Sequence, residues 1–305
     1  MGSPFSPHSA GAQSIASVFS LVLFIAAVVF VIVVAGVFYC VVRYRARGAA
    51  SGEPRQVFGS PRLETLWTII PLIVMMGLFI VTVRAMILVD APQDPDHSPD
   101  LVVTAHQWWW EARYPNGVLA TWDVHIPAGR RLRARIDSAD VIHDFWVPDL
   151  ARKIDAVPGR WSYVWLEADQ PGTYAGTCSE FCGAQHAWMR FRVVAQPQSE
   201  FDAWLQNEAG YQPNAAPGAG ERLFGQKCGE CHALSPLAPS SRKGPNLAHI
   251  ASREFLGGGI ARNTPEALML WLTDPQAAKP GNRMPSVILT PAERAALRGF
   301  LETVK

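Results

Sequence analysis

The sequence predicts a multidomain membrane protein with a two-helix transmembrane hairpin, an all-β domain outside the membrane and a small all-α domain at the end. Three patterns predict this architecture: two long apolar runs within the first 90 residues, then short β-rich segments separated by turns, then segments with helical periodicity. The chain has 305 residues, 49% hydrophobic and 17% charged, which is apolar for a soluble protein. A net charge of +1 argues against a nucleic-acid partner.

The first apolar run, about 15–42, and the second, within a helix expected at 64–89, are each long enough to cross a membrane. A buried core helix is the alternative for both. A cleaved signal peptide is a further alternative for the first, but the first fourteen residues contain no Lys or Arg. We therefore expect a retained anchor and a membrane hairpin within residues 1–92.

The loop between the two spans is rich in arginine, and positive loops stay in the cytoplasm. Both chain ends and everything after the hairpin are then expected outside, in an oxidising compartment. Cys40, inside the first span, is expected to fill space as a small apolar residue. The loop arginines are Arg43, Arg45, Arg47, Arg55 and Arg62.

A proline-rich connector, 91–99, leads into the β domain, which we place at 93–210. Strands are expected at 101–104, 118–124, 132–136 and 163–167, where β-forming residues alternate with Pro-Gly turns, and a short helix is expected at 199–210. These elements predict an antiparallel sandwich or barrel. Residues 211–220 have the composition of a linker.

The all-α domain is expected at 221–305. Thr264-Pro-Glu and Thr290-Pro-Ala-Glu293 each place threonine where a helix N-cap would be and proline at the first helical position, and the second also predicts a capping box. Both threonines therefore mark the start of a helix.

Soft metal ligands are concentrated in Cys178-Ser-Glu-Phe-Cys182-Gly-Ala-Gln-His186-Ala-Trp-Met189. Thiolate, thioether and imidazole together suit copper. Two thiolates on one loop can bridge two coppers, and the site needs a second histidine, for which His143 is the best candidate. A structural disulfide or a mononuclear copper or zinc site are the alternatives.

This pattern, with Val-Ile-His143 upstream, resembles subunit II of haem-copper cytochrome c oxidases, from the first span to about Ala195. The resemblance implies a cupredoxin-like Greek-key domain that holds the binuclear copper centre CuA. In the family the Glu180 carboxylate also reaches a magnesium ion shared with subunit I. The implied copper ligands are His143, Cys178, Cys182, His186, Met189 and the backbone carbonyl of Glu180.

Two further segments resemble the same family. In Ala105-His-Gln-Trp108-Trp-Trp110, the resemblance favours Trp108 as the exposed residue through which electrons arrive from a cytochrome c, and Trp110 as core. Ordinary sandwich packing is the alternative for Trp108. Leu63-Glu64-Thr-Leu-Trp resembles a segment whose carboxylate stands near a proton pathway, which makes Glu64 a candidate for proton uptake; otherwise Glu64 is simply a helix N-terminal charge.

Cys228-Gly-Glu-Cys231-His232 is the signature of covalent haem c attachment, with His232 as an axial ligand. A thioredoxin-like pair is the alternative, but no βαβ pattern surrounds it. Gly244-Pro-Asn-Leu247 resembles class I cytochromes c, and the Asn282-Arg-Met284-Pro loop resembles their second ligand loop. Met284 is thus the expected second ligand, ahead of Met269, which lies in a helical stretch, and His249.

Residues 91–210 carry 10 basic and 16 acidic residues and residues 221–305 carry 11 and 7, so the two outer domains have opposite net charge. The resemblance implies the electron-input subunit of a caa-type oxidase in the bacterial inner membrane. Its expected partners are subunit I, subunit III, membrane lipid, and a cytochrome c or another membrane electron donor. A CuA-containing nitric oxide reductase and a copper-storage or delivery protein are the alternatives; a quinol oxidase fits less well because that branch generally lacks the copper ligands.

Overall fold

The computed structural model describes residues 2–45, 56, 58–94, 96–213, 218–238 and 243–305. The chain divides into two compact units: Gln13–Val89 is one, and Met1–Ala12 with Asp90–Lys305 is the other.

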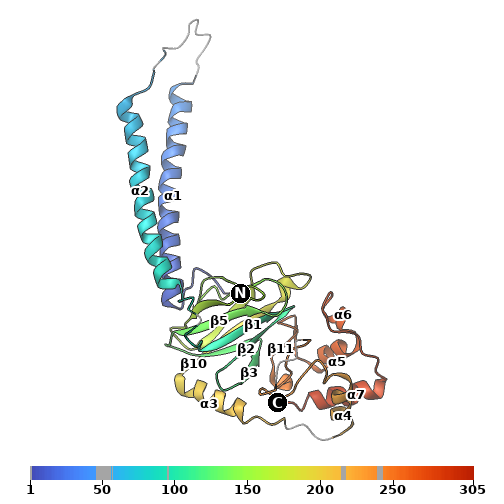
Figure 1. Cartoon of the computed structure of the whole chain (residues 1–305). Helices are drawn as coiled ribbons and strands as arrows, with labels where there is room; N and C mark the ends of the chain where they lie inside the picture. Colours follow the sequence, from blue (N-terminus) through green and yellow to red (C-terminus); the bar gives the residue numbers. More distant parts are fainter. Residues whose placement is uncertain (1, 46–55, 57, 95, 214–217, 239–242) are drawn as a thin grey trace. The chain divides into compact units, whose positions relative to one another are not determined.

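The first unit consists of the helices α1 (Ala10–Arg43) and α2 (Pro61–Val89), drawn in blue and cyan in Figure 1. Their most apolar windows have mean hydropathies of 3.3 and 2.6, so both are long and apolar enough to span a membrane. The predicted spans 15–42 and 64–89 lie inside them. Arg47 and Arg55 of the predicted cytoplasmic loop lie outside the described residues.

The β domain contains two five-stranded sheets, in the strand orders β3-β2-β1-β5-β8 and β4-β10-β9-β6-β7 (Figure 1). Most neighbours are antiparallel, but β1 pairs with β5 and β4 with β10 in parallel, because the chain crosses between sheets as in a Greek key. The strands are β1 (Leu101–His106), β2 (Trp109–Arg113), β3 (Leu119–Thr121), β4 (Asp123–Pro127), β5 (Leu132–Ser138), β6 (His143–Trp146), β7 (Ile154–Ala156), β8 (Ser162–Leu166), β9 (Gly172–Cys178) and β10 (Arg190–Gln196).

Period-2 burial builds the sandwich core. In β10 every second residue is buried, which directs Phe191, Val193 and Ala195 inward. Trp110 is fully buried, as predicted, and its ring centroid lies 5.5 Å from that of Phe145 and 5.3 Å from that of Phe191. This aromatic cluster packs against the start of β6, where the His143 ring centroid lies 6.0 Å from that of Trp110.

The prediction of one strand over 118–124 was wrong. Trp122 has a left-handed backbone conformation (φ 68°), and the chain leaves one sheet at β3 and joins the other at β4. Alternating β-forming residues on both sides of Trp122 conceal this change of sheet from a sequence reading.

The helix expected at 199–210 is confirmed as α3 (Gln198–Ala209), whose Trp204 packs edge-on against Tyr114 at 5.2 Å between centroids. Of the predicted linker 211–220, residues 214–217 lie outside the described residues, and its end already belongs to the next helix, α4 (Ala219–Lys227).

The C-terminal domain is mainly helical (Figure 1). Its buried apolar side chains form a small core of their own. Both predicted N-caps are confirmed: the Thr264 side chain accepts from the Ala267 N–H, and Thr290 and Glu293 form a capping box. A short β11–β12 hairpin was not predicted. The elements are α4 (Ala219–Lys227), η2 (Ile250–Ser252), β11 (Phe255–Leu256), β12 (Ala261–Arg262), α5 (Pro265–Thr273), α6 (Pro275–Ala278) and α7 (Pro291–Leu301).

Candidate metal and haem sites

The predicted copper ligands converge at one end of the β4-β10-β9-β6-β7 sheet. His143 begins β6 and Cys178 ends its neighbour β9, where the register pairs Phe145 with Cys178. The loop that follows turns through the short helix η1 (His186–Trp188) and returns at Met189, whose carbonyl accepts from the Cys178 N–H at 3.2 Å. Two adjacent strands therefore fix both ends of the ligand loop.

The potential donor atoms lie within a few ångströms of one another. His143 Nδ1 is 3.8 Å from Cys178 Sγ, and the two sulfur atoms of Cys178 and Cys182 are 3.8 Å apart. His186 Nδ1 and Met189 Sδ lie 3.7 and 3.8 Å from Cys182 Sγ. The Glu180 carbonyl oxygen is 3.2 Å from Cys178 Sγ. Two thiolates flanked by two imidazoles, one thioether and one carbonyl make a donor set that fits a pair of coppers bridged by sulfur.

The pKa values of the two cysteine thiols also favour binding of a soft metal. A hydrogen bond from Cys182 holds the pKa of the Cys178 thiol well below its usual range, and the same contact together with burial raises the pKa of Cys182. The two thiols therefore share one proton at this distance. A metal that binds both sulfurs takes the place of that proton.

Asp140 fixes the orientation of His143. Its carboxylate accepts a hydrogen bond from His143 Nε2 at 2.8 Å, which leaves Nδ1 directed toward the sulfurs, and it also accepts from the backbone N–H groups of Val141 and Gln107. Burial alone would lower the pKa of His143, but the bonds with Asp140 and Cys178 outweigh it and raise that pKa. Asp140 was not predicted, although its position three residues before His143 is the sequence signal for it.

Trp108 is hydrogen-bonded to the backbone of the ligand loop. Its indole Nε1 donates to the Cys182 carbonyl oxygen at 3.0 Å, and the Gln107 side-chain amide donates to the same oxygen at 2.6 Å. Trp108 is only partly exposed, whereas the sequence predicted an exposed contact. Its ring lies under the Arg283 guanidinium, 5.7 Å from the ring centroid.

The predicted haem ligands lie in the C-terminal domain. Cys228 and Cys231 are free, half-buried thiols around the end of α4. His232 Nδ1 donates to the Pro245 carbonyl at 2.7 Å, which leaves Nε2 available as an iron ligand. Burial lowers the pKa of His232 and keeps the imidazole neutral, as ligation requires. A Cβ on Gly244 would lie 2.7 Å from the His232 ring, so this glycine leaves room for it.

Three residues were considered for the second axial ligand of the haem: Met284, Met269 and His249. Met284 is half-buried, and its sulfur accepts from Trp271 Nε1 at 3.0 Å. Met269 lies within α5, as predicted, and the His249 ring is engaged by Glu208 Oε2 at 3.0 Å. The donor types and the fixed His232 tautomer fit a covalently attached haem c. Of the remaining predicted residues, Glu64 lies in the first turn of α2, and the Glu180 side chain is exposed.

A membrane hairpin, a cupredoxin-like sandwich with a thiolate and imidazole cluster, and a cytochrome c domain together define a membrane-anchored electron-transfer protein. The sequence matches the family descriptions "Cytochrome C oxidase subunit II, transmembrane domain" over residues 5–84, "Cytochrome C oxidase subunit II, periplasmic domain" over 118–196 and "Cytochrome c" over 218–305. The chain belongs to the cytochrome c oxidase subunit II family, with a cytochrome c domain at its C-terminal end.

Two curated proteins are similar to most of this chain, and one solved structure is similar to its β domain. "Cytochrome c oxidase subunit 2" of Alkalihalophilus pseudofirmus is 35% identical, over 98% of this chain and 90% of that protein. The protein of the same name from Bacillus sp. strain PS3 is 34% identical, over 86% of this chain and 79% of its own length. The crystal structure of the periplasmic domain of subunit II of Bradyrhizobium japonicum cytochrome oxidase is 31% identical, covers 37% of this chain and 94% of that one, and has a TM-score of 0.35.

Membership in the family has direct consequences. The chain is a two-pass membrane protein and a subunit II of cytochrome c oxidase, which implies subunit I as its partner. Its periplasmic domain implies CuA copper, and its cytochrome c domain implies haem c.

Proposed function

We propose that this chain receives electrons for an aerobic caa-type terminal oxidase. Electrons from a cytochrome c or another membrane donor would pass through the haem domain to the copper domain and on to subunit I, where oxygen is reduced to water with coupled proton translocation. When bound, haem c and the copper pair supply one-electron carriers whose geometry changes little with charge. The protein supplies the ligands, the orientation and the exclusion of water.

One observation carries this proposal above the others. His143, Cys178 and Cys182 lie within 4.8 Å of one another at buried positions in a folded sandwich, on the same chain as the Cys-x-x-Cys-His motif. A storage protein has no need of a second redox group, so the combination favours electron transfer. The same combination of sites also fits a subunit of a nitric oxide reductase. Such an enzyme differs from an oxidase in its terminal electron acceptor.

The ligand roles are part of the proposal. Copper would be held by His143, Cys178, Cys182, His186, Met189 and the Glu180 carbonyl. Haem would be attached through Cys228 and Cys231, with His232 and Met284 as axial ligands. We also propose domain boundaries at 1–92, 93–210, 211–220 and 221–305.

The contact with subunit I is proposed to lie beside the copper ligands. Phe181 is 77% exposed and Ile142 47% exposed, and such apolar side chains beside a buried polar site favour a protein partner. The exposed Glu180 carboxylate would share a magnesium ion with that partner. Subunit III and membrane lipid would contact the hairpin, in the bacterial inner membrane with both chain ends on the periplasmic side.

Trp108 and Glu64 have proposed roles in transfer. The hydrogen bond from the Trp108 indole to the Cys182 carbonyl supports a role as the last residue before copper. Glu64, in the first turn of α2, would stand near the cytoplasmic mouth of a proton pathway in subunit I.

Electron paramagnetic resonance and visible spectra of the purified, copper-loaded holoprotein test this function. We expect the hyperfine pattern of one unpaired electron shared by two copper nuclei, beside the bands of a low-spin haem c. A mononuclear copper pattern, or none, would contradict it and favour metal delivery. Turnover by the assembled complex with oxygen or with nitric oxide identifies the acceptor.

A further inference from the structure

One short loop of the sandwich, Asp149–Arg152, receives the chain from both membrane helices. We call it the anchor loop. The residues up to Ala12 and those from Asp90 onward belong to the same compact unit as the sandwich. Within this unit, Ser9 at the start of α1 and Asp90 at the end of α2 both contact the anchor loop.

Ser9 joins the start of α1 to the anchor loop. It is only 1% exposed, and its hydroxyl donates to the Leu150 carbonyl oxygen at 2.6 Å. The same hydroxyl oxygen accepts from the Ala12 N–H at 2.9 Å, which is the contact of a helix N-cap. One buried hydroxyl therefore connects the first turn of a membrane helix to the sandwich, and its removal would leave two backbone groups without this partner.

The residues before Ser9 extend the same attachment. The His8 N–H donates to the Asp149 carbonyl at 2.7 Å, and the His8 carbonyl accepts from the Asp169 N–H at 2.8 Å. The His8 ring centroid lies 5.3 Å from that of Tyr174 in β9. The Ser3 N–H donates to the Asp149 carboxylate at 2.6 Å. The chain that leads into α1 is thus bonded along the sandwich on both sides of His8.

Asp90, the first residue after α2, makes the second attachment. Its carboxylate lies 2.9 Å from Arg152 Nε, at the other end of the anchor loop. Its backbone pairs with Val164, and its carbonyl accepts from Trp165 Nε1 at 3.2 Å. The ion pair is partly exposed to solvent, so we expect it to contribute less than the buried Ser9 bonds.

The anchor loop is continuous with the strand that carries His143. Leu150 and Ala151 are buried in the sandwich core, and the N–H groups of both donate to the Val147 carbonyl at 2.9 Å. Val147 directly follows β6, which begins at His143. A four-residue strand is therefore all that separates this buried turn from a proposed copper ligand.

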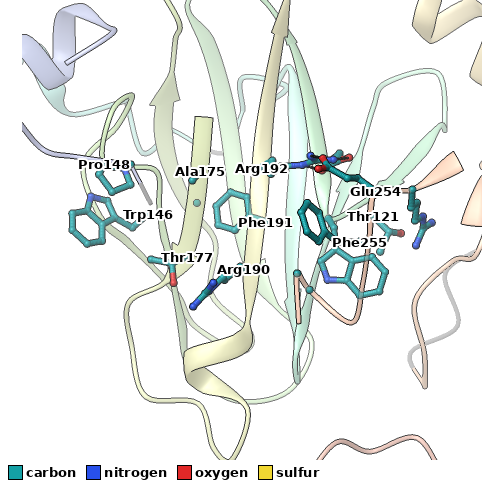
Figure 2. A pocket seen from close by; sticks show the side chains of 17 residues that line it. Thr121, Trp146, Pro148, Ala175, Thr177, Arg190, Phe191, Arg192, Glu254 and Phe255 are labelled. Atoms are coloured by element: carbon teal, nitrogen blue, oxygen red, sulfur yellow. Dashed lines mark hydrogen bonds and ion pairs between the residues drawn. The ribbon is translucent and has the colours of Figure 1, made fainter. Parts of the chain in front are cut away.

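The second ligand strand runs beside the same segment. Figure 2 shows Trp146 and Pro148 next to Ala175 and Thr177 of β9; all four line a cavity of about 470 Å³. The register pairs Trp146 with Thr177, one residue before Cys178. The chain that enters the anchor loop is thus paired with the strand that ends at a proposed bridging cysteine.

We propose that the anchor loop sets the position of the copper site relative to the two membrane helices within this chain, before subunit I binds, with Ser9 and Arg152 as its positioning residues. The inference rests on the proposed function and names what holds the copper site ready for transfer to subunit I. Domains joined by a single connection move relative to one another by default. Two attachments to four consecutive residues restrict that motion.

Pulsed electron paramagnetic resonance on the full chain tests the proposal, with copper and haem loaded, in a lipid nanodisc without subunit I. Cys40 is exposed on α1 and the other four cysteines are proposed ligands, so a nitroxide label can be placed on Cys40 alone. We expect a single narrow distribution of distances between the label and the copper pair. A broad distribution in the unmodified chain would overturn the proposal and assign the positioning to subunit I.

A matched pair of double variants assigns the positioning to the anchor loop. Ser9→Ala with Arg152→Gln should widen the distance distribution at least about twofold, because two buried hydrogen bonds and an ion pair are lost. Ser20→Ala with Arg130→Gln should not widen it, since the Ser20 hydroxyl donates within α1 and Arg130 pairs with Asp100. Equal widths in the two double variants would contradict the assignment.

Electron transfer in the assembled complex distinguishes positioning from mere stability. Ser9→Ala with Arg152→Gln should slow transfer from the copper pair to subunit I at least about twofold, because transfer depends on the placement of the donor, while the copper and haem spectra stay unchanged. Flash photolysis measures the rate. An unchanged rate would remove the positioning role from both residues.

Hydrogen exchange of the same samples separates this proposal from the proposed function, because the N–H groups of His8, Ala12 and Asp169 report the attachment without copper. If the shared-electron copper pattern is present while these groups exchange rapidly, the anchor loop alone fails. If the copper pattern is missing, the proposed function fails. Slow exchange that is lost in Ser9→Ala with Arg152→Gln would still support the attachment in that case, and rapid exchange would overturn it.

Discussion

The proposed copper and haem sites of this chain differ in how far the polypeptide builds them. His143, Cys178, Cys182 and Met189 are at most 3% exposed, and the two cysteines and Met189 belong to the sandwich core. Cys228, Cys231, His232 and Met284 are all only half-buried. Most of the proposed copper ligands thus lie in the sandwich core, whereas the proposed haem ligands lie nearer the surface of their domain.

The difference follows from secondary structure. Adjacent strands pair residue by residue, so the register of β6 with β9 places His143 near Cys178 without a metal. The proposed haem ligands follow the end of a nine-residue helix or lie in a loop, and a short helix positions such residues less firmly than paired strands do. We therefore expect loss of haem to damage its domain more than loss of copper damages the sandwich.

The largest expected effect comes from removing haem attachment. Cys228→Ala with Cys231→Ala should abolish covalent haem and destabilise the C-terminal domain by about 3–4 kcal/mol, because a tightly held ligand supplies stability of that order. Haem staining of a denaturing gel and hydrogen exchange by peptide measure both outcomes. Equal loss of protection in β9 and β10 would contradict the separation of the two regions.

The next effect concerns the copper pair. Cys182→Ser removes one bridging sulfur, so we expect the shared-electron copper pattern to disappear while the haem bands stay unchanged. Electron paramagnetic resonance measures it, and Cys40→Ser, in the membrane span, is the control. A copper pattern that survives the change at Cys182 would remove that residue from the site.

The sequence pattern grouped the candidate ligands, but it did not show the residues that support them. The copper loop is contiguous, so Cys178, Cys182, His186 and Met189 could be grouped by spacing, and Thr264 and Thr290 marked helix starts locally. The sequence did not show the turn at Trp122 between the sheets or the close approach of Gly258 to the Trp188 carbonyl oxygen, because both depend on residues distant in sequence. Contacts between residues far apart in the chain leave only weak patterns in the local sequence.

The proposed second haem ligand can be tested against its rival. Met284→Ala should remove the charge-transfer band between thioether sulfur and iron and lower the haem potential, since thioether ligation raises it. Met269→Ala, within α5, should preserve the band. If the band instead survives in Met284→Ala and disappears in Met269→Ala, Met269 is the second axial ligand.

A smaller effect is expected from the carboxylate behind His143. Asp140→Ala should weaken copper binding about 10–100-fold, the usual cost of losing the group that orients a histidine ligand. Asp140→Asn keeps an acceptor oxygen and should recover part of the affinity. Competition with a copper chelator measures both, and a copper affinity unchanged in Asp140→Ala would contradict the orienting role.

The smallest effect is a dependence on pH from Lys279, whose pKa falls from 10.5 to about 8 through burial. Between these values the unfolded chain still binds a proton that the folded chain has released, so stability rises with pH. The haem domain should gain about 1 kcal/mol from this lysine between pH 8 and 9, where one pKa unit is worth about 1.4 kcal/mol. Chemical unfolding of the holoprotein at both pH values, with Lys279→Met as the control, measures the contribution of Lys279 to the free energy of unfolding. A gain that persists in Lys279→Met would assign the pH dependence to other groups and leave the buried lysine without a measurable cost.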